Sequence, residues 1–142
     1  MGKKAVTTSF KVIEKEESMM TKVFFTIGSI SGFLAVAVGA FAAHFLKEKL
    51  SPEMFSIFEV GVRYHMYHAL GLFVVAWAIS YFTSSNLAPA GWLFIVGTII
   101  FSGSLYVLSL SGTRWWGMVT PIGGLCFLAG WFWMAWSIWR EL

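Results

Sequence analysis

The chain has 142 residues, of which 58% are hydrophobic and only 12% are charged, about half the charged share of an ordinary soluble domain. No soluble core of this length can hide so much apolar surface, so the composition predicts a small polytopic membrane protein. The net charge of +3 is spread over both tails and the first loop, which argues against nucleic acid as a partner, and the single Cys126 excludes an internal disulfide.

Residues 1–19 form a polar segment of mixed charge without apolar periodicity, and they predict a flexible or surface-lying N-terminal tail. Met19 and Met20 stand directly before the first apolar run, so this tail can also be read as an extension ahead of a natural start. We interpret residues 20–142 as one four-helix transmembrane domain.

The first predicted span is Val23 to Ala43, which is uncharged throughout and covers roughly the 30 Å of a bilayer's hydrocarbon core. A signal peptide is the alternative, but the run exceeds the usual h-region of about 7 to 15 residues. Small residues recur along this helix every three or four positions: Gly28, Gly32, Ala35, Gly39 and Ala43. They predict a packing groove for another helix of the same protomer, with a dimer seam as the alternative.

A short amphipathic helix is expected between the first and second spans. Ser51, Pro52 and Glu53 have the composition of a helix start, and a polar stripe runs from Glu53 to Arg63. This pattern predicts a helix that lies in the membrane interface and leads into the second span.

The remaining spans are predicted at about 64–82, 90–110 and 117–139, joined by the turn Thr83 to Pro89 and the loop Ser111 to Trp116. Tryptophans fall at the two predicted interfaces, Trp92, Trp136 and Trp139 at one and Trp115 and Trp116 at the other. Four spans place both termini on one side. If Lys and Arg residues are counted from Met1, the positive-inside rule places both termini in the cytoplasm. If they are counted from Met19, the rule places both termini on the opposite side.

Four stretches carry a family resemblance: GAFAAHFLK (39–47), RYHMYHALGL (63–72), FSGSLYVLSLSG (101–112) and GMVTPIGGLCFLAGW (117–131). In order and spacing they resemble the signatures of a small four-helix integral membrane protein family of unknown function, the YgdD/YwdK-like family. The similarity covers essentially everything from Met20 onward. His44 and His68 match the family, which more often has Gly where Ala42 stands and Gln where His65 stands. The resemblance implies a four-helix fold in a bacterial cytoplasmic (inner) membrane and no established activity.

The candidate polar site consists of three histidines near one membrane face. His44 closes the first span, while His65 and His68 open the second, so antiparallel packing should bring the rings into one interfacial layer. Helical spacing turns His65 and His68 towards the bundle, and His68 should be buried. The structural interpretation is that the imidazoles bond to neighbouring helices, with Thr120, Ser102, Ser104 and Tyr106 as available partners. A proton path, a ligand pocket and a three-histidine metal site are the functional alternatives.

Thr120-Pro121-Ile122-Gly123-Gly124 opens the fourth span and predicts a kink or a broken helix end. Broken helices expose backbone to substrates in transporters. The simpler interpretation is kinked packing of this segment against the small-residue stripe of the first helix.

Two classes of function follow from these features. The first is a non-catalytic structural, accessory or assembly component of the membrane, because the sequence has no nucleophile with a base, no acid pair and no phosphate loop. The second is a small homo-oligomeric transporter or proton-linked channel that uses His44, His68 and the Pro121 segment. The lipid bilayer is the expected partner, with a larger membrane complex or further copies of the chain; neither a cofactor nor a resident metal is predicted.

Overall fold

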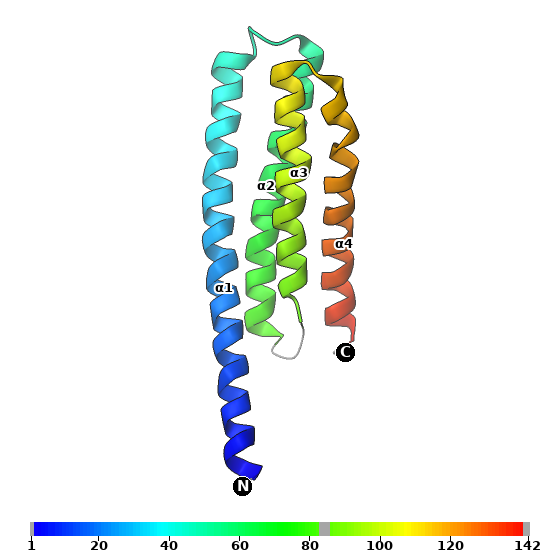
Figure 1. The fold of residues 1–142 in the computed structure, drawn as a ribbon. Coiled ribbons are helices and arrows are strands. Elements are labelled where there is room, and N and C mark those ends of the chain that lie inside the picture. Colours follow the sequence, from blue (N-terminus) through cyan, green and yellow to red (C-terminus); the bar gives the residue numbers. More distant parts are fainter. Residues whose placement is uncertain (1, 83–85, 141–142) are drawn as a thin grey trace.

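The structure is a computed structural model that describes residues 2–82 and 86–140, with the backbone alone for residues 2–14. Within these ranges every regular element is helical: α1 (Gly2–Phe41), η1 (Ala42–Leu46), α2 (Pro52–Tyr81), α3 (Ala88–Ser111), η2 (Arg114–Met118) and α4 (Thr120–Trp139). The four long helices run up and down, with α2 and α3 between α1 and α4 (Figure 1). The predicted all-α membrane bundle is therefore confirmed as an architecture.

Helix α1 is longer than expected, because it continues through the segment that the sequence predicts as a flexible or surface-lying tail. It has 40 residues, which is about 60 Å and roughly twice the thickness of the hydrocarbon core. Its N-terminal part projects well beyond the other helices (Figure 1). Lys and Glu are good helix formers, so the run from Lys11 to Glu17 can extend a helix without an apolar face.

Helix α2 begins as predicted but does not form a separate interfacial helix. Ser51 is the N-cap, and its Oγ accepts a hydrogen bond from the backbone N–H of Met54 at 3.2 Å, with Pro52 in the first turn. From there one helix of 30 residues, about 45 Å long, runs through Arg63 and on to Tyr81. No glycine or proline pair breaks the segment, so the amphipathic stretch forms the first turns of α2.

Three segments of the described chain are long and apolar enough to cross a membrane: Lys15–Leu46, Ala88–Ser111 and Arg114–Trp139. Helix α2 is not among them, because its most apolar part, residues 64–81, contains two histidines and three tyrosines. Its position is nevertheless fixed by packing, since it lies along both α1 and α3. The sequence-predicted turn Thr83 to Pro89 lies partly outside the described residues, which omit 83–85.

The small-residue stripe of α1 packs against α2 of the same chain, as expected. A Cβ on Gly28 would lie 3.2 Å from the carbonyl oxygen of Ala69, and one on Gly39 would lie 3.1 Å from a methyl group of Val62. Gly32 faces Ala69 more loosely, at 4.0 Å. The stripe therefore lets two helix backbones approach each other inside one protomer.

The start of α4 differs from the predicted kinked packing on α1. Pro121 lies in the first turn of α4, where its missing N–H has no helical partner to lose, and the helix continues without a break. Gly123 contacts α3 instead: a Cβ there would overlap the backbone nitrogen of Phe101 and lie 2.8 Å from its Cα, while Gly124 has ordinary contacts with the Phe101 ring. The break is located before α4, between η2 and Thr120.

Candidate functional site

His68 connects α2 with α4 in the bundle interior. Its side chain is 5% exposed, which confirms the predicted inward orientation. The indole N–H of Trp131 donates to Nε2 at 3.3 Å, and Nδ1 lies 2.9 Å from the carbonyl oxygen of Tyr64. Because Nε2 accepts a hydrogen bond, the proton resides on Nδ1 and bonds to Tyr64, which defines a neutral imidazole. The ring also stacks on Phe127 at 3.4 Å with an interplanar angle of 4°.

The partners expected for His68 lie elsewhere in the bundle. Ser104 and Thr120 bond to each other across α3 and α4, with their hydroxyl oxygens 2.8 Å apart. The hydroxyl of Tyr106 contacts His65 rather than His68. The partners predicted for His68 were therefore wrong, because the rotation of one helix against another cannot be obtained from spacing within each helix.

His65 is the residue that joins three helices. Its Nε2 lies 3.0 Å from Oγ of Ser31 on α1, and its Nδ1 lies 3.2 Å from the hydroxyl of Tyr106 on α3. Sequence reasoning missed Ser31, although its position between Gly28 and Gly32 of the small-residue stripe placed it close to α2.

His44 lies apart from this network. It is exposed within the π-helical turn η1, and the described residues record neither a hydrogen bond nor a ring contact between it and His65 or His68. Gly39 packs against Val62, so His44 lies about two helical turns away from the level of His65, and the predicted layer of three histidines is not formed. Across the described residues, no three His, Cys, Asp or Glu side chains come close enough together to hold a metal ion.

A hollow of about 410 Å³, which we call the α1–α3 groove, opens beside the His65 network. Its walls are α1 and α3 and its floor is α2. Polar side chains line it at Ser31, His65, Thr98, Ser102 and Tyr106, and the other lining residues are Ile27, Ile30, Leu34, Leu72, Ile95, Ile99 and Gly103. The groove is thus mainly apolar with a few hydrogen-bonding groups, the composition typical of small-molecule sites.

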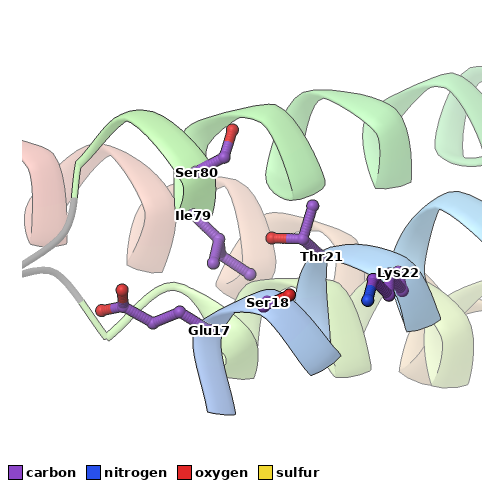
Figure 2. A pocket seen from close by; sticks show the side chains of 6 residues that line it. All are labelled: Glu17, Ser18, Thr21, Lys22, Ile79 and Ser80. Atoms are coloured by element: carbon purple, nitrogen blue, oxygen red, sulfur yellow. The ribbon is translucent and has the colours of Figure 1, made fainter. Parts of the chain in front are cut away.

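Two further hollows of about 300 Å³ each lie towards the ends of the α1–α2 pair. One is lined by Glu17, Ser18, Thr21 and Lys22 of α1 and by Ile79 and Ser80 of α2, and its charged side chains lie at the edge (Figure 2). The other lies beside Glu59 and Arg63. Neither contains a buried polar atom without a partner among the residues described.

The fold and the site together define a class: a small helical membrane protein whose apolar helices are joined by a few buried polar contacts. The family model for a protein of unknown function, DUF423, matches residues 38–124. The chain belongs to this family, as its sequence resemblance implied.

Curated relatives agree with this assignment over most of their length. The chain is 48% identical over 110 residues to a UPF0382 membrane protein of Staphylococcus haemolyticus, which covers 78% of this chain and 89% of the relative. It is 45% identical over 111 residues to the membrane protein YwdK of Bacillus subtilis, with coverages of 78% and 90%. It is 38% identical over 113 residues to the inner membrane protein YgdD of Escherichia coli, with coverages of 80% and 86%. No solved structure matches the chain.

Proposed function

We propose that this protein is a non-catalytic structural, accessory or assembly component of the bacterial cytoplasmic membrane. The observation that supports this proposal is that buried and half-buried polar side chains join one helix to another. His65 connects α2 to α1 and α3, His68 connects α2 to α4, and Ser104 with Thr120 connects α3 to α4. Each of these groups holds one helix against another, which is the common role of polar side chains in membrane bundles.

The proposal includes four membrane crossings, with α2 as the second. A backbone in hydrocarbon must satisfy its own hydrogen bonds, and the uninterrupted helix α2 does so. Its polar residues His65 and His68 face other helices, so they do not require water at that depth. Packing along two apolar helices gives α2 the same depth in the bilayer as its neighbours.

The arrangement closest to a catalytic one is the pair of Ser31 and His65, and it lacks the supporting groups that catalysis needs. The second nitrogen of His65 meets the hydroxyl of Tyr106 rather than a carboxylate. Ser31 lies within α1, where backbone N–H groups are used by the helix and cannot form an oxyanion hole. This pair therefore favours a packing role.

The experiment is purification of the full chain from native membranes in mild detergent, followed by two measurements. Crosslinking from Phe33 on α1 and from Phe132 on α4, both strongly exposed, should identify a stoichiometric membrane partner or a second copy on one of these faces. Reconstituted proteoliposomes should show no proton flux above that of empty vesicles. A flux that His68→Gln abolishes would refute the proposal and favour the transporter or channel.

A further inference from the structure

The α1–α3 groove contains a buried hydroxyl group that has no partner. Ser102 is 1% exposed, and its Oγ makes no hydrogen bond within the part of the chain that the structure describes. Other buried serines of the same helix are satisfied; Ser109, for example, donates to the carbonyl oxygen of Leu105 at 2.7 Å. A buried hydroxyl without a partner is costly in an apolar environment. Ser102 lines the groove, and its Oγ is closed off in this side-chain rotamer, so its proton reaches a bound molecule once the hydroxyl rotates towards the groove.

The His65 network adds a second available proton. A neutral imidazole has one donor and one acceptor nitrogen, so one of its two partners, Ser31 or Tyr106, donates to the ring and the other accepts from it. The hydroxyl that accepts keeps its own proton unused, and this holds for either tautomer. In the described chain neither hydroxyl has another recorded bond. The groove therefore offers at least two hydroxyl donors, and the complementary group is a hydrogen-bond acceptor.

The surroundings of these donors are apolar and face the membrane. Ser31 lies near the middle of the apolar run of α1, and Ser102 lies near the middle of α3. The rims of the groove carry exposed apolar side chains, with Ile30 56% exposed and Ile99 68% exposed. A ligand at this depth must enter from the hydrocarbon, which excludes an ion or a polar metabolite.

The size of the groove favours a small molecule over another helix. The hollow extends along α1 only from Ile27 to Leu34, about two turns. A helix that crosses the membrane needs about 20 residues, or five to six turns, so a hollow of two turns is too short to hold one along its length. The hollow has a volume of about 410 Å³. That volume lies within the usual range of ligand pockets.

We propose that the α1–α3 groove binds a lipophilic molecule whose oxygen, a carbonyl, ester or ether, accepts hydrogen bonds from Ser102 and from Ser31 or Tyr106. Its alkyl part lies along Ile30, Leu34 and Ile99. This ligand site goes beyond the proposed role in the membrane, and it can be tested on purified protein without any partner.

The test uses a long-chain methyl ketone that carries a photoactivatable diazirine in its alkyl chain, added to the full chain in lipid nanodiscs. Saturable labelling of the segments 27–34 and 95–106 is expected. A matched probe with a methylene in place of the carbonyl should label them at least tenfold less. A phospholipid that bears the same diazirine distinguishes a membrane lipid from a free compound as the natural ligand. Saturable labelling by this phospholipid identifies a membrane lipid ester as the ligand. Labelling by the ketone alone identifies a free lipophilic compound.

Three variants locate the site. Ser102→Ala should weaken ketone binding about tenfold, which corresponds to about 1.4 kcal/mol. Gly103→Leu should abolish the labelling, because a Cβ at Gly103 meets nothing within 4 Å and the larger side chain fills the groove. Ser109→Ala is the control; it removes a buried hydroxyl of the same helix outside the groove, and it should label like the native protein.

The proposal is overturned if the ketone and its hydrocarbon analogue label equally, or if Gly103→Leu leaves the labelling unchanged while thermal melting confirms that the variant is folded. It is also overturned if Ile99→Cys forms disulfide-linked dimers in membranes at high yield, because a second copy would then cover the groove.

Discussion

At the scale of single residues, the bond between Trp131 and His68 should contribute measurably to stability. Trp131→Phe keeps an aromatic ring but removes the N–H donor, so we expect a loss of about 1 kcal/mol in the free energy of unfolding. His68→Ala should cost more, about 2 to 3 kcal/mol, because it also removes the stack on Phe127 and leaves the indole N–H unpaired. Unfolding titrations in mixed micelles measure both. Trp136→Phe, at an exposed position, is the control and should be neutral.

His65 provides a second prediction at this scale. Gln has both a donor and an acceptor and can replace the two bonds to Ser31 and Tyr106, so His65→Gln should change stability by less than about 0.5 kcal/mol. His65→Leu cannot form either bond and should cost about 1 to 2 kcal/mol. The same titrations apply, and equal stability of the Leu variant and the native protein would contradict the bridging role.

The sequence predicted which polar residues face inward but not which of them meet. Helical periodicity was sufficient to place His68 inside, because position within one helix determines its face. The partners of His68 and His65 depend on the rotation and sliding of neighbouring helices, which no pattern within one helix reveals. For this reason the sequence did not predict Trp131 as a partner of His68, which lies more than sixty positions earlier in the chain.

At the scale of helices, glycines with opposite surroundings allow a matched test. Gly123 lies directly against the backbone of Phe101, so Gly123→Ala must push α4 away from α3 and should cost about 1 to 3 kcal/mol. Gly103 has open space around it, so Gly103→Ala should be neutral or stabilise by up to about 1 kcal/mol through helix propensity. Thermal melting in detergent compares the two. If both variants lost the same stability, close packing of α3 and α4 at Gly123 would be refuted.

The N-terminal extension of α1 should be dispensable. Most of it projects beyond the other helices (Figure 1), and a chain that begins at Met19 keeps Met20, Val23 and Phe24, with which α1 packs in the core. We expect this truncation to accumulate in membranes and to melt as the full chain does, which immunoblotting of membrane fractions and thermal scans would measure. Failure of the shortened chain to insert would assign residues 1–18 a role in biogenesis.

Helix boundaries were easier to predict than the character of each helix. Ser51 and Pro52 marked the start of α2 because capping is local chemistry. The fourth span was predicted to begin at Gly117 and to kink at Pro121, whereas Pro121 lies in the first turn of α4. The prediction of a separate interfacial helix was wrong, because an amphipathic pattern indicates which face of a helix is polar but not where the helix ends. The sequence did not predict a helix over the N-terminal residues of α1, because helix formation in this segment depends on helix propensity rather than on apolar periodicity.

At the scale of the whole molecule, the order of the helices in space follows from packing that composition alone cannot specify. Apolar length predicted a bundle, but the central position of α2 and α3 depends on close contacts such as Gly28 with Ala69 and Gly123 with Phe101. The α1–α3 groove is equally invisible in the sequence, because Ser31, Ser102 and Tyr106 come together only once α1 and α3 lie on the same side of α2.

The crossing of α2 is the central claim, because α2 is the one long helix of the described chain that its composition alone does not identify as a span. Single cysteines at Ser51 and Asn86, introduced into a Cys126→Ala background, can be labelled with a membrane-impermeant maleimide in sealed vesicles of known orientation. Four crossings predict that the two positions react from opposite sides and that Arg140→Cys reacts from the same side as Asn86→Cys. Labelling of Ser51→Cys and Asn86→Cys from the same side would contradict the four-helix membrane bundle.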